Sequence, residues 1–111
     1  MLALLIALAA SSGISGTVAT APTCPVERLP PDPSCAPRRL AGAEVTVVRR
    51  HRRVATTHSD SDGRFRLSLA PGRYVVRAST GHALPRPETR VVRVRRGKVA
   101  RVRMVLDSGI R

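Results

Sequence analysis

The stretch from Asp62 to Arg77 constrains the fold of this chain more than any other part of the sequence. It opens with an Asp-Gly turn signal, and Phe65 then begins an alternation of apolar residues with arginine and serine. A Pro-Gly pair interrupts the alternation, which resumes at Tyr74. A period of two on both sides of a short turn is typical of two antiparallel strands, each with one apolar face. The sequence therefore predicts a β-hairpin here, with arginines on its exposed face.

The same alternation recurs along the rest of the chain. It predicts further strands at residues 14–20, 40–49, 54–58, 88–95 and 98–106. Residues 21–39 hold six of the nine prolines and are predicted to form a long loop, because proline lacks a backbone donor and fixes φ. Seven short strands separated by turns predict an all-β fold, a seven-stranded antiparallel β-sandwich.

Aromatic residues are scarce, with one Phe, one Tyr and no Trp in the chain. The core must therefore consist of Val, Leu, Ile and Ala around Phe65 and Tyr74. Exposed rings that stack against sugars or nucleobases are disfavoured for the same reason.

The net charge of +13 resides in the predicted sandwich, because residues 38–111 contain 19 basic and 5 acidic residues. Such a surface attracts polyanions. Solvated strand faces are the alternative, because 19 of the 20 basic residues are Arg, as a GC-rich genome also produces. The candidate anion-binding residues lie in a predicted cationic turn at 49–53 and on the polar faces of the last two strands: Arg49, Arg50, Arg52, Arg53, Arg93, Arg95, Arg101 and Arg103.

Residues 2–10 form an apolar run that is too short to span a bilayer. Small residues follow it up to Gly13, as in a secretory signal with its cleavage site. A buried N-terminal helix or strand is the alternative. We therefore predict a signal-like segment at 1–13, a sandwich at 14–107, a tail at 108–111, and a secreted or cell-envelope location.

Cys24 and Cys35 are the only cysteines, and both lie in the proline-rich loop. Two thiols in an exported chain are most simply paired, so we predict a structural disulfide. A redox or metal site is the alternative, but the spacing is not C-x-x-C and no other thiol could complete a zinc site.

The sequence contains no pattern of catalytic residues. Asp60 and Asp62 match part of a calcium-binding loop, but Leu69 stands where that loop needs a bidentate Glu, so a turn explains them better. The three histidines are expected in turns and at strand ends. There is no nucleophile elbow, phosphate-binding glycine loop, zinc finger or DNA-binding helix. We expect a protein that is not an enzyme, with no catalytic, cofactor-binding or metal-binding residue.

The run from Gly63 to Val76 reads G-x-F-x-L-x-L-x-P-G-x-Y-x-V and resembles the signature of carboxypeptidase regulatory-like domains. These domains belong to the prealbumin-like (transthyretin-like) group of β-sandwiches. Residues 14–18 and 40–47 resemble the first two strands of that family. The resemblance implies an accessory domain, because the zinc site of the metallocarboxypeptidases that carry it lies in a separate domain.

The chain departs from this family in its long proline-rich loop with two cysteines. In a related branch, the collagen-adhesin B-type domains, a Lys forms an isopeptide bond with Asn or Asp. Here the only Lys is Lys98, and the first strand offers Thr17 and Val18, so that cross-link is not supported.

These observations predict a non-catalytic exported β-sandwich module with a structural or interaction role at the cell envelope or exterior. Its partner there is unknown. The alternative is a cationic protein that binds an acidic glycan or envelope polymer in preference to nucleic acid. Neither hypothesis includes a small-molecule substrate or sequence-specific binding of nucleic acid.

Overall fold

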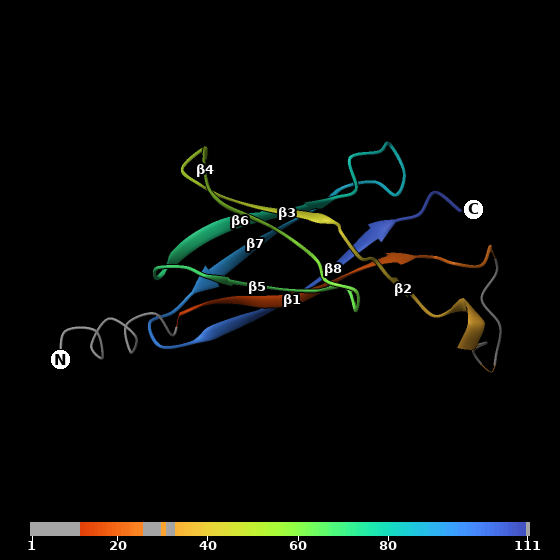
Figure 1. Ribbon diagram of the computed structural model, residues 1–111, viewed down its shortest axis with the longest axis horizontal. Helices are drawn as coiled ribbons and strands as arrows, with labels where there is room; N and C mark the ends of the chain where they lie inside the picture. The colour runs from red at the N-terminus through yellow and green to blue at the C-terminus, as the bar shows by residue number, and fades with distance from the viewer. Residues whose placement is uncertain (1–11, 26–29, 31–32, 111) are drawn as a thin grey trace.

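The computed structural model describes residues 12–25, 30 and 33–110. This part of the chain forms eight strands and one short 3-10 helix, η1 (Pro33–Cys35), in two facing sheets (Figure 1). The strands in chain order are β1 (Gly13–Ala21), β2 (Arg38–Arg39), β3 (Glu44–Arg49), β4 (Arg52–His58), β5 (Arg64–Ser68), β6 (Gly72–Ser79), β7 (Glu88–Val94) and β8 (Val99–Asp107). The predicted β-sandwich is confirmed. The strand beyond the predicted seven is β2, which lies inside the predicted loop.

β1 is the central strand of the first sheet. It pairs in parallel with β8 over its whole length, from Gly13 opposite Val99 to Ala21 opposite Asp107. Along its other edge β1 pairs antiparallel with β5 and then with β2. The sandwich is therefore not wholly antiparallel, because its first and last strands run in the same direction.

The second sheet is antiparallel throughout, in the order β4-β3-β6-β7. The hairpin predicted at residues 62–77 is wrong in one respect, because β5 belongs to the first sheet and β6 to the second. The turn at Pro71 carries the chain from one sheet to the other. Both strands still direct their apolar side chains inward, and Phe65 and Tyr74 belong to the same core although they lie in different sheets.

The core between the sheets is aliphatic, as predicted. Its members are buried to at least nine-tenths and come from six strands and the segment before β3: Ile14, Val18, Ala43, Val45, Val47, Phe65, Tyr74, Val76, Ala78, Val94, Val102, Met104 and Leu106. The two rings are included, and the Tyr74 hydroxyl donates a hydrogen bond of 2.5 Å to the carbonyl of Ala70.

Gly16 lies on the inner face of β1, opposite Phe65 and Val102. A Cβ atom at this position would come within 2.8 Å of Phe65 Cζ and would collide with the backbone oxygen of Val102. The absence of a side chain at residue 16 therefore allows the Phe65 ring to lie against β1.

The predicted signal-like segment lies mostly outside the described residues. Ser12 and Gly13 are described and belong to the sandwich, since Ser12 is buried and its Oγ accepts a hydrogen bond of 3.2 Å from the backbone N–H of Gly97. Among the described residues, no helix has the length and apolar character needed to cross a bilayer.

Candidate functional site

The predicted disulfide between Cys24 and Cys35 is present, with a distance of 5.3 Å between the two Cα atoms. It closes the proline-rich loop onto η1. A hydrogen bond of 3.1 Å from Thr23 Oγ1 to the carbonyl of Ala36 lies beside it. The cross-link restrains a segment in which β2 and η1 are the only regular elements that the structure describes.

The turn before β5 is held by the carboxylate of Asp60. Its Oδ1 accepts hydrogen bonds from the backbone N–H groups of Asp62, at 2.8 Å, and Arg64, at 2.9 Å. These two bonds lower the pKa of Asp60, first that from Arg64 and then that from Asp62, and the positive charges of Arg64 and Arg39 lower it further. The turn interpretation therefore accounts for the residues that resemble a calcium loop.

The three histidines are exposed and lie in separate places, His51 in the β3–β4 turn, His58 at the end of β4 and His82 in the loop before β7. Within the described part of the chain, no group of three or more His, Cys, Asp or Glu side chains is arranged to hold a metal ion.

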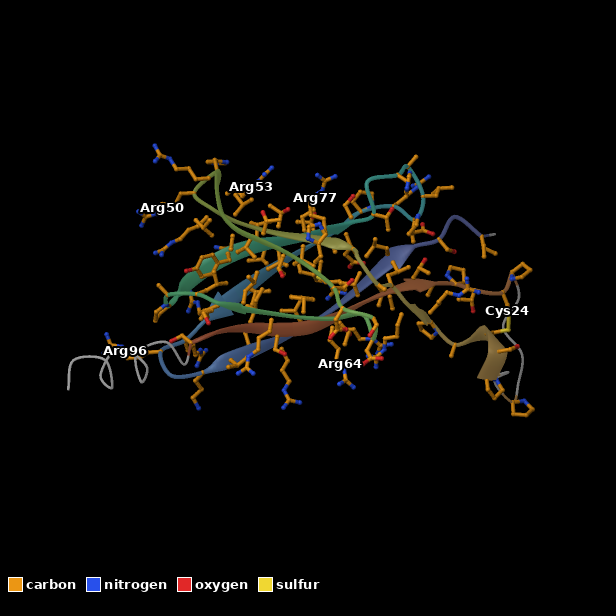
Figure 2. All side chains as sticks on the ribbon, in the orientation of Figure 1. Cys24, Arg50, Arg53, Arg64, Arg77 and Arg96 are labelled. Carbon is orange, nitrogen blue, oxygen red and sulfur yellow. A yellow bond between two sulfur atoms is a disulfide. The ribbon has the colours of Figure 1, made fainter. Side chains whose placement is uncertain are left out.

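The first candidate cluster of arginines lies at the tip of the β3–β4 hairpin (Figure 2). The turn itself has only two residues, Arg50 and His51, whose φ angles are +52° and +65°. Arg49 ends β3 and lies over the ring of Tyr74, 5.6 Å from its centroid. Arg52 begins β4, so the predicted turn at 49–53 is mostly strand.

The structure separates the second group of candidate arginines. Arg93 lies on the edge strand β7 of the second sheet, opposite Arg73, and Arg95 follows the end of that strand. Arg101 and Arg103 lie on β8, in the first sheet. The last two strands therefore do not form one cationic face.

Arg101 and Arg103 instead share a face with arginines that the sequence did not single out as a site. Ser15 on β1 lies between Arg66 of β5 and Arg101 of β8, and Thr17 lies between Arg64 of β5 and Arg103 of β8. These six residues line a surface groove of about 680 Å³, which we call the arginine groove. The alternation in β5 predicted that Arg64 and Arg66 are exposed, but only the sheet topology places them opposite β8.

The arginine groove lies on the outer, solvent-facing side of the first sheet. The arginines of the second sheet lie on the opposite side of the molecule. Figure 2 shows Arg64 pointing outward on one side of the molecule, and Arg77 and Arg53 pointing outward on the other. No carboxylate lines the groove. An ion pair joins Arg90 to Glu88 on β7 of the second sheet, at 3.0 Å. None of the four guanidinium groups of the groove takes part in that pair, although Asp60 lies beside Arg64 and Arg66 in an adjoining hollow and interacts with the charge of Arg64.

The fold agrees with two solved structures. Klebsiella pneumoniae 5-hydroxyisourate hydrolase superposes with a TM-score of 0.58 at 16% identity, over 87% of this chain and 91% of that one. The Bacillus anthracis TIE protein superposes with a TM-score of 0.57 at 16% identity, over 86% of this chain and 18% of that one. At this identity both likenesses concern the fold alone. No curated protein sequence matches the chain.

The resemblance noted in the sequence is confirmed by a family comparison. The carboxypeptidase regulatory-like domain matches residues 33–107, from η1 to the end of β8. The matched region includes every strand of the second sheet and most of the core. The chain is therefore a member of the carboxypeptidase regulatory-like domain family.

Proposed function

We propose that this protein is a non-catalytic exported module with a structural or interaction role at the cell envelope or exterior. The observation that carries the proposal is the Cys24–Cys35 disulfide in a carboxypeptidase regulatory-like domain. Disulfides persist in oxidising compartments and are rare in reducing ones. The apolar run at residues 2–10 supports export by a signal-like segment.

A non-catalytic role fits the family better than hydrolysis does. The likeness to a hydrolase extends over most of both chains, but at 16% identity it concerns the fold and not the reaction. The described acidic side chains that make hydrogen bonds or ion pairs lie in turns or on strand surfaces, as Asp60 and Glu88 do. This arrangement suits a module that supports or binds another molecule.

The location is tested by fractionating the native cells and trapping free thiols with an alkylating reagent. The expected result is an extracytoplasmic protein with both cysteines oxidised and an N-terminus at or before Ser12, since Ser12 is part of the sandwich.

In the matched Cys24→Ser/Cys35→Ser variant we expect the free energy of unfolding to fall by about 2–3 kcal/mol. A full-length chain in the cytosol with two alkylated thiols would refute the proposal.

A second candidate function is the binding of an acidic glycan or envelope polymer. Nucleic acid is the less favoured ligand. It is favoured by the arginine groove and by the arginines at the β3–β4 hairpin tip. A pull-down from the native envelope fraction at low and high salt tests it. A ligand held mainly through arginines should be recovered at low salt and lost at high salt. Recovery of no polyanion at low salt would count against this function.

A further inference from the structure

We propose that the arginine groove binds one extended chain of phosphate groups, which lies along β1 with one phosphate over Ser15 and another, further along the same chain, over Thr17. The proposal rests on the second candidate function and gives it a site and a ligand class. The groove is the surface where the register of three strands brings together four arginines and two hydroxyl groups.

The strand register divides the arginine groove into two equivalent rows. The first row is Arg66, Ser15 and Arg101, and the second is Arg64, Thr17 and Arg103. Residues two apart on a strand are separated by about 7 Å, and β5 and β8 are about 10 Å apart across β1. An arginine from each wall can therefore reach over the small central residue and meet the other at a single anion.

The shape of each row favours a tetrahedral oxyanion. A phosphate group directs its oxygens in several directions, so it can accept from a guanidinium group on each wall and from the hydroxyl beneath it. Arg pairs with phosphate through two parallel hydrogen bonds, which adds geometric selectivity to the charge. A planar carboxylate has only two oxygens in one plane and cannot use all three donors equally well.

The hydroxyl groups on the floor of the groove are free to take part. Among the described residues, neither Ser15 nor Thr17 makes a side-chain hydrogen bond, whereas Thr20 further along β1 donates 3.1 Å to the carbonyl of Leu106. The difference arises because Ser15 and Thr17 point outward and Thr20 points into the sandwich. Two unused donors beneath four arginines are arranged to receive an acceptor from solvent.

The groove continues along β1, which favours a polymer over a single ion. A second hollow of about 420 Å³ adjoins it and is lined by Thr17, Ala19, Pro37, Arg39 and Arg103. Arg39 on β2 lies opposite Ala19, one step of two residues beyond Thr17. The positive charges therefore repeat along β1 at about the same interval of 7 Å.

The same face lacks the features of a nucleic-acid platform. No aromatic side chain lines the outer surface of the groove except at one end, where the largely buried Phe65 borders an adjoining hollow. Binding of single strands depends on rings on which the bases stack. The recognition is therefore directed to the charged backbone of the polymer, and a linear polyphosphate reproduces that chemistry in its simplest form.

The test measures binding of a short linear polyphosphate to the purified disulfide-bonded protein by titration calorimetry over a range of salt concentrations. A polyuronate oligomer of matched charge and a single-stranded oligonucleotide are the competing ligands. Three double variants each remove two positive charges, namely Arg66→Gln/Arg101→Gln in the groove, Arg50→Gln/Arg53→Gln at the hairpin tip and Arg73→Gln/Arg77→Gln on the second sheet. Ser15→Ala tests the floor without changing the charge.

We expect the groove variant to bind polyphosphate at least about tenfold more weakly, with a salt slope smaller by about 0.7 for each phosphate that the variant no longer neutralises. The affinity of the other two double variants for polyphosphate should stay within about threefold of that of the wild type. Salt screens charges that lie more than a Debye length from the bound ligand. Ser15→Ala should weaken binding by about two- to tenfold and leave the salt slope unchanged, and an unchanged affinity in this variant would overturn the site. If the groove variant does not fold, as judged by circular dichroism, Ser15→Ala alone decides the test.

Equal reductions of affinity in all three double variants would overturn the site, because they would indicate a general effect of charge. Weaker binding in the hairpin-tip variant alone would overturn the groove but leave anion binding as a function. Binding of polyuronate or oligonucleotide as tightly as polyphosphate would overturn the ligand class. Failure of every polyanion to bind at low salt would refute both the groove and the second candidate function, without bearing on the exported module.

Discussion

Ser59 connects the end of β4 to the segment that leads from β2 into β3. Its Oγ donates a hydrogen bond of 2.5 Å to the carbonyl of Leu40 and accepts one of 2.9 Å from the backbone N–H of Ala43. Ser59 is 5% exposed and Ala43 is 1% exposed, so water cannot easily replace either bond. Replacing this serine with alanine removes both bonds with the loss of a single oxygen atom.

The cost of Ser59→Ala follows from the two groups that it leaves unpaired. An unsatisfied buried N–H costs about 1–3 kcal/mol of stability. Loss of the hydrogen bond to the partly buried carbonyl of Leu40 costs about 0.5–1.5 kcal/mol more. We therefore expect the free energy of unfolding to fall by about 2–3 kcal/mol, a large share of the roughly 5–15 kcal/mol typical of a domain. The corresponding fall in Tm is about 10 °C or more for a domain of this size.

The stability of Ser59→Ala can be measured by urea denaturation, followed by circular dichroism and by the fluorescence of Tyr74, the single tyrosine in the chain. The m-value should remain unchanged, so the loss of stability shows as a fall in the midpoint of about 2 M. Ser61→Ala is the matched control, because Ser61 is exposed. A loss below about 0.5 kcal/mol, or one equal to that of the control, would refute the reasoning.

Three further variants test other parts of the sandwich by the same denaturation assay. Gly16→Ala should destabilise the protein by about 3 kcal/mol, because the new methyl group collides with Phe65 and with backbone. Asp60→Asn should lower stability at neutral pH, where the carboxylate is ionised. Its difference from the wild type should shrink as the pH falls through the lowered pKa of Asp60. Replacing Arg50 with Asn and His51 with Gly should stabilise by about 1 kcal/mol, because those residues tolerate positive φ angles better.

Each of these expectations has an outcome that contradicts it. Unchanged stability in Gly16→Ala would mean that β1 can shift away from Phe65 at little cost. A difference between Asp60→Asn and the wild type that stays constant down to acid pH would separate the turn from the ionisation of Asp60. A destabilised hairpin variant would indicate that Arg50 or His51 makes interactions that outweigh the strain of its backbone.

The alternation of side chains was sufficient to predict the strands and their inward faces. Phe65, Tyr74 and Met104 are buried where the period of two places them, and the disulfide joins the two cysteines of the proline-rich loop. These features depend on local sequence, because the pleat of a strand fixes which side chains share a face.

The pairing of strands could not be obtained in the same way. Nothing in β5 or β6 indicates that they belong to different sheets, because both arrangements bury the same apolar faces. β2 has only two residues and pairs with β1 across the proline-rich loop, so it leaves no periodic pattern. The arginine groove depends on pairing between residues that are distant in sequence, which is why the sequence alone does not group its four arginines.

The parallel pairing of β1 with β8 determines how the domain would respond to mechanical tension. A pull on the chain before Gly13 and on the chain after Asp107 acts along the two strands in opposite directions. The hydrogen bonds between them are evenly spaced and would be loaded together in shear, instead of breaking one after another from one end of the strands. Tethered by its two ends, the sandwich is therefore arranged to resist stretching until the entire β1–β8 pairing gives way.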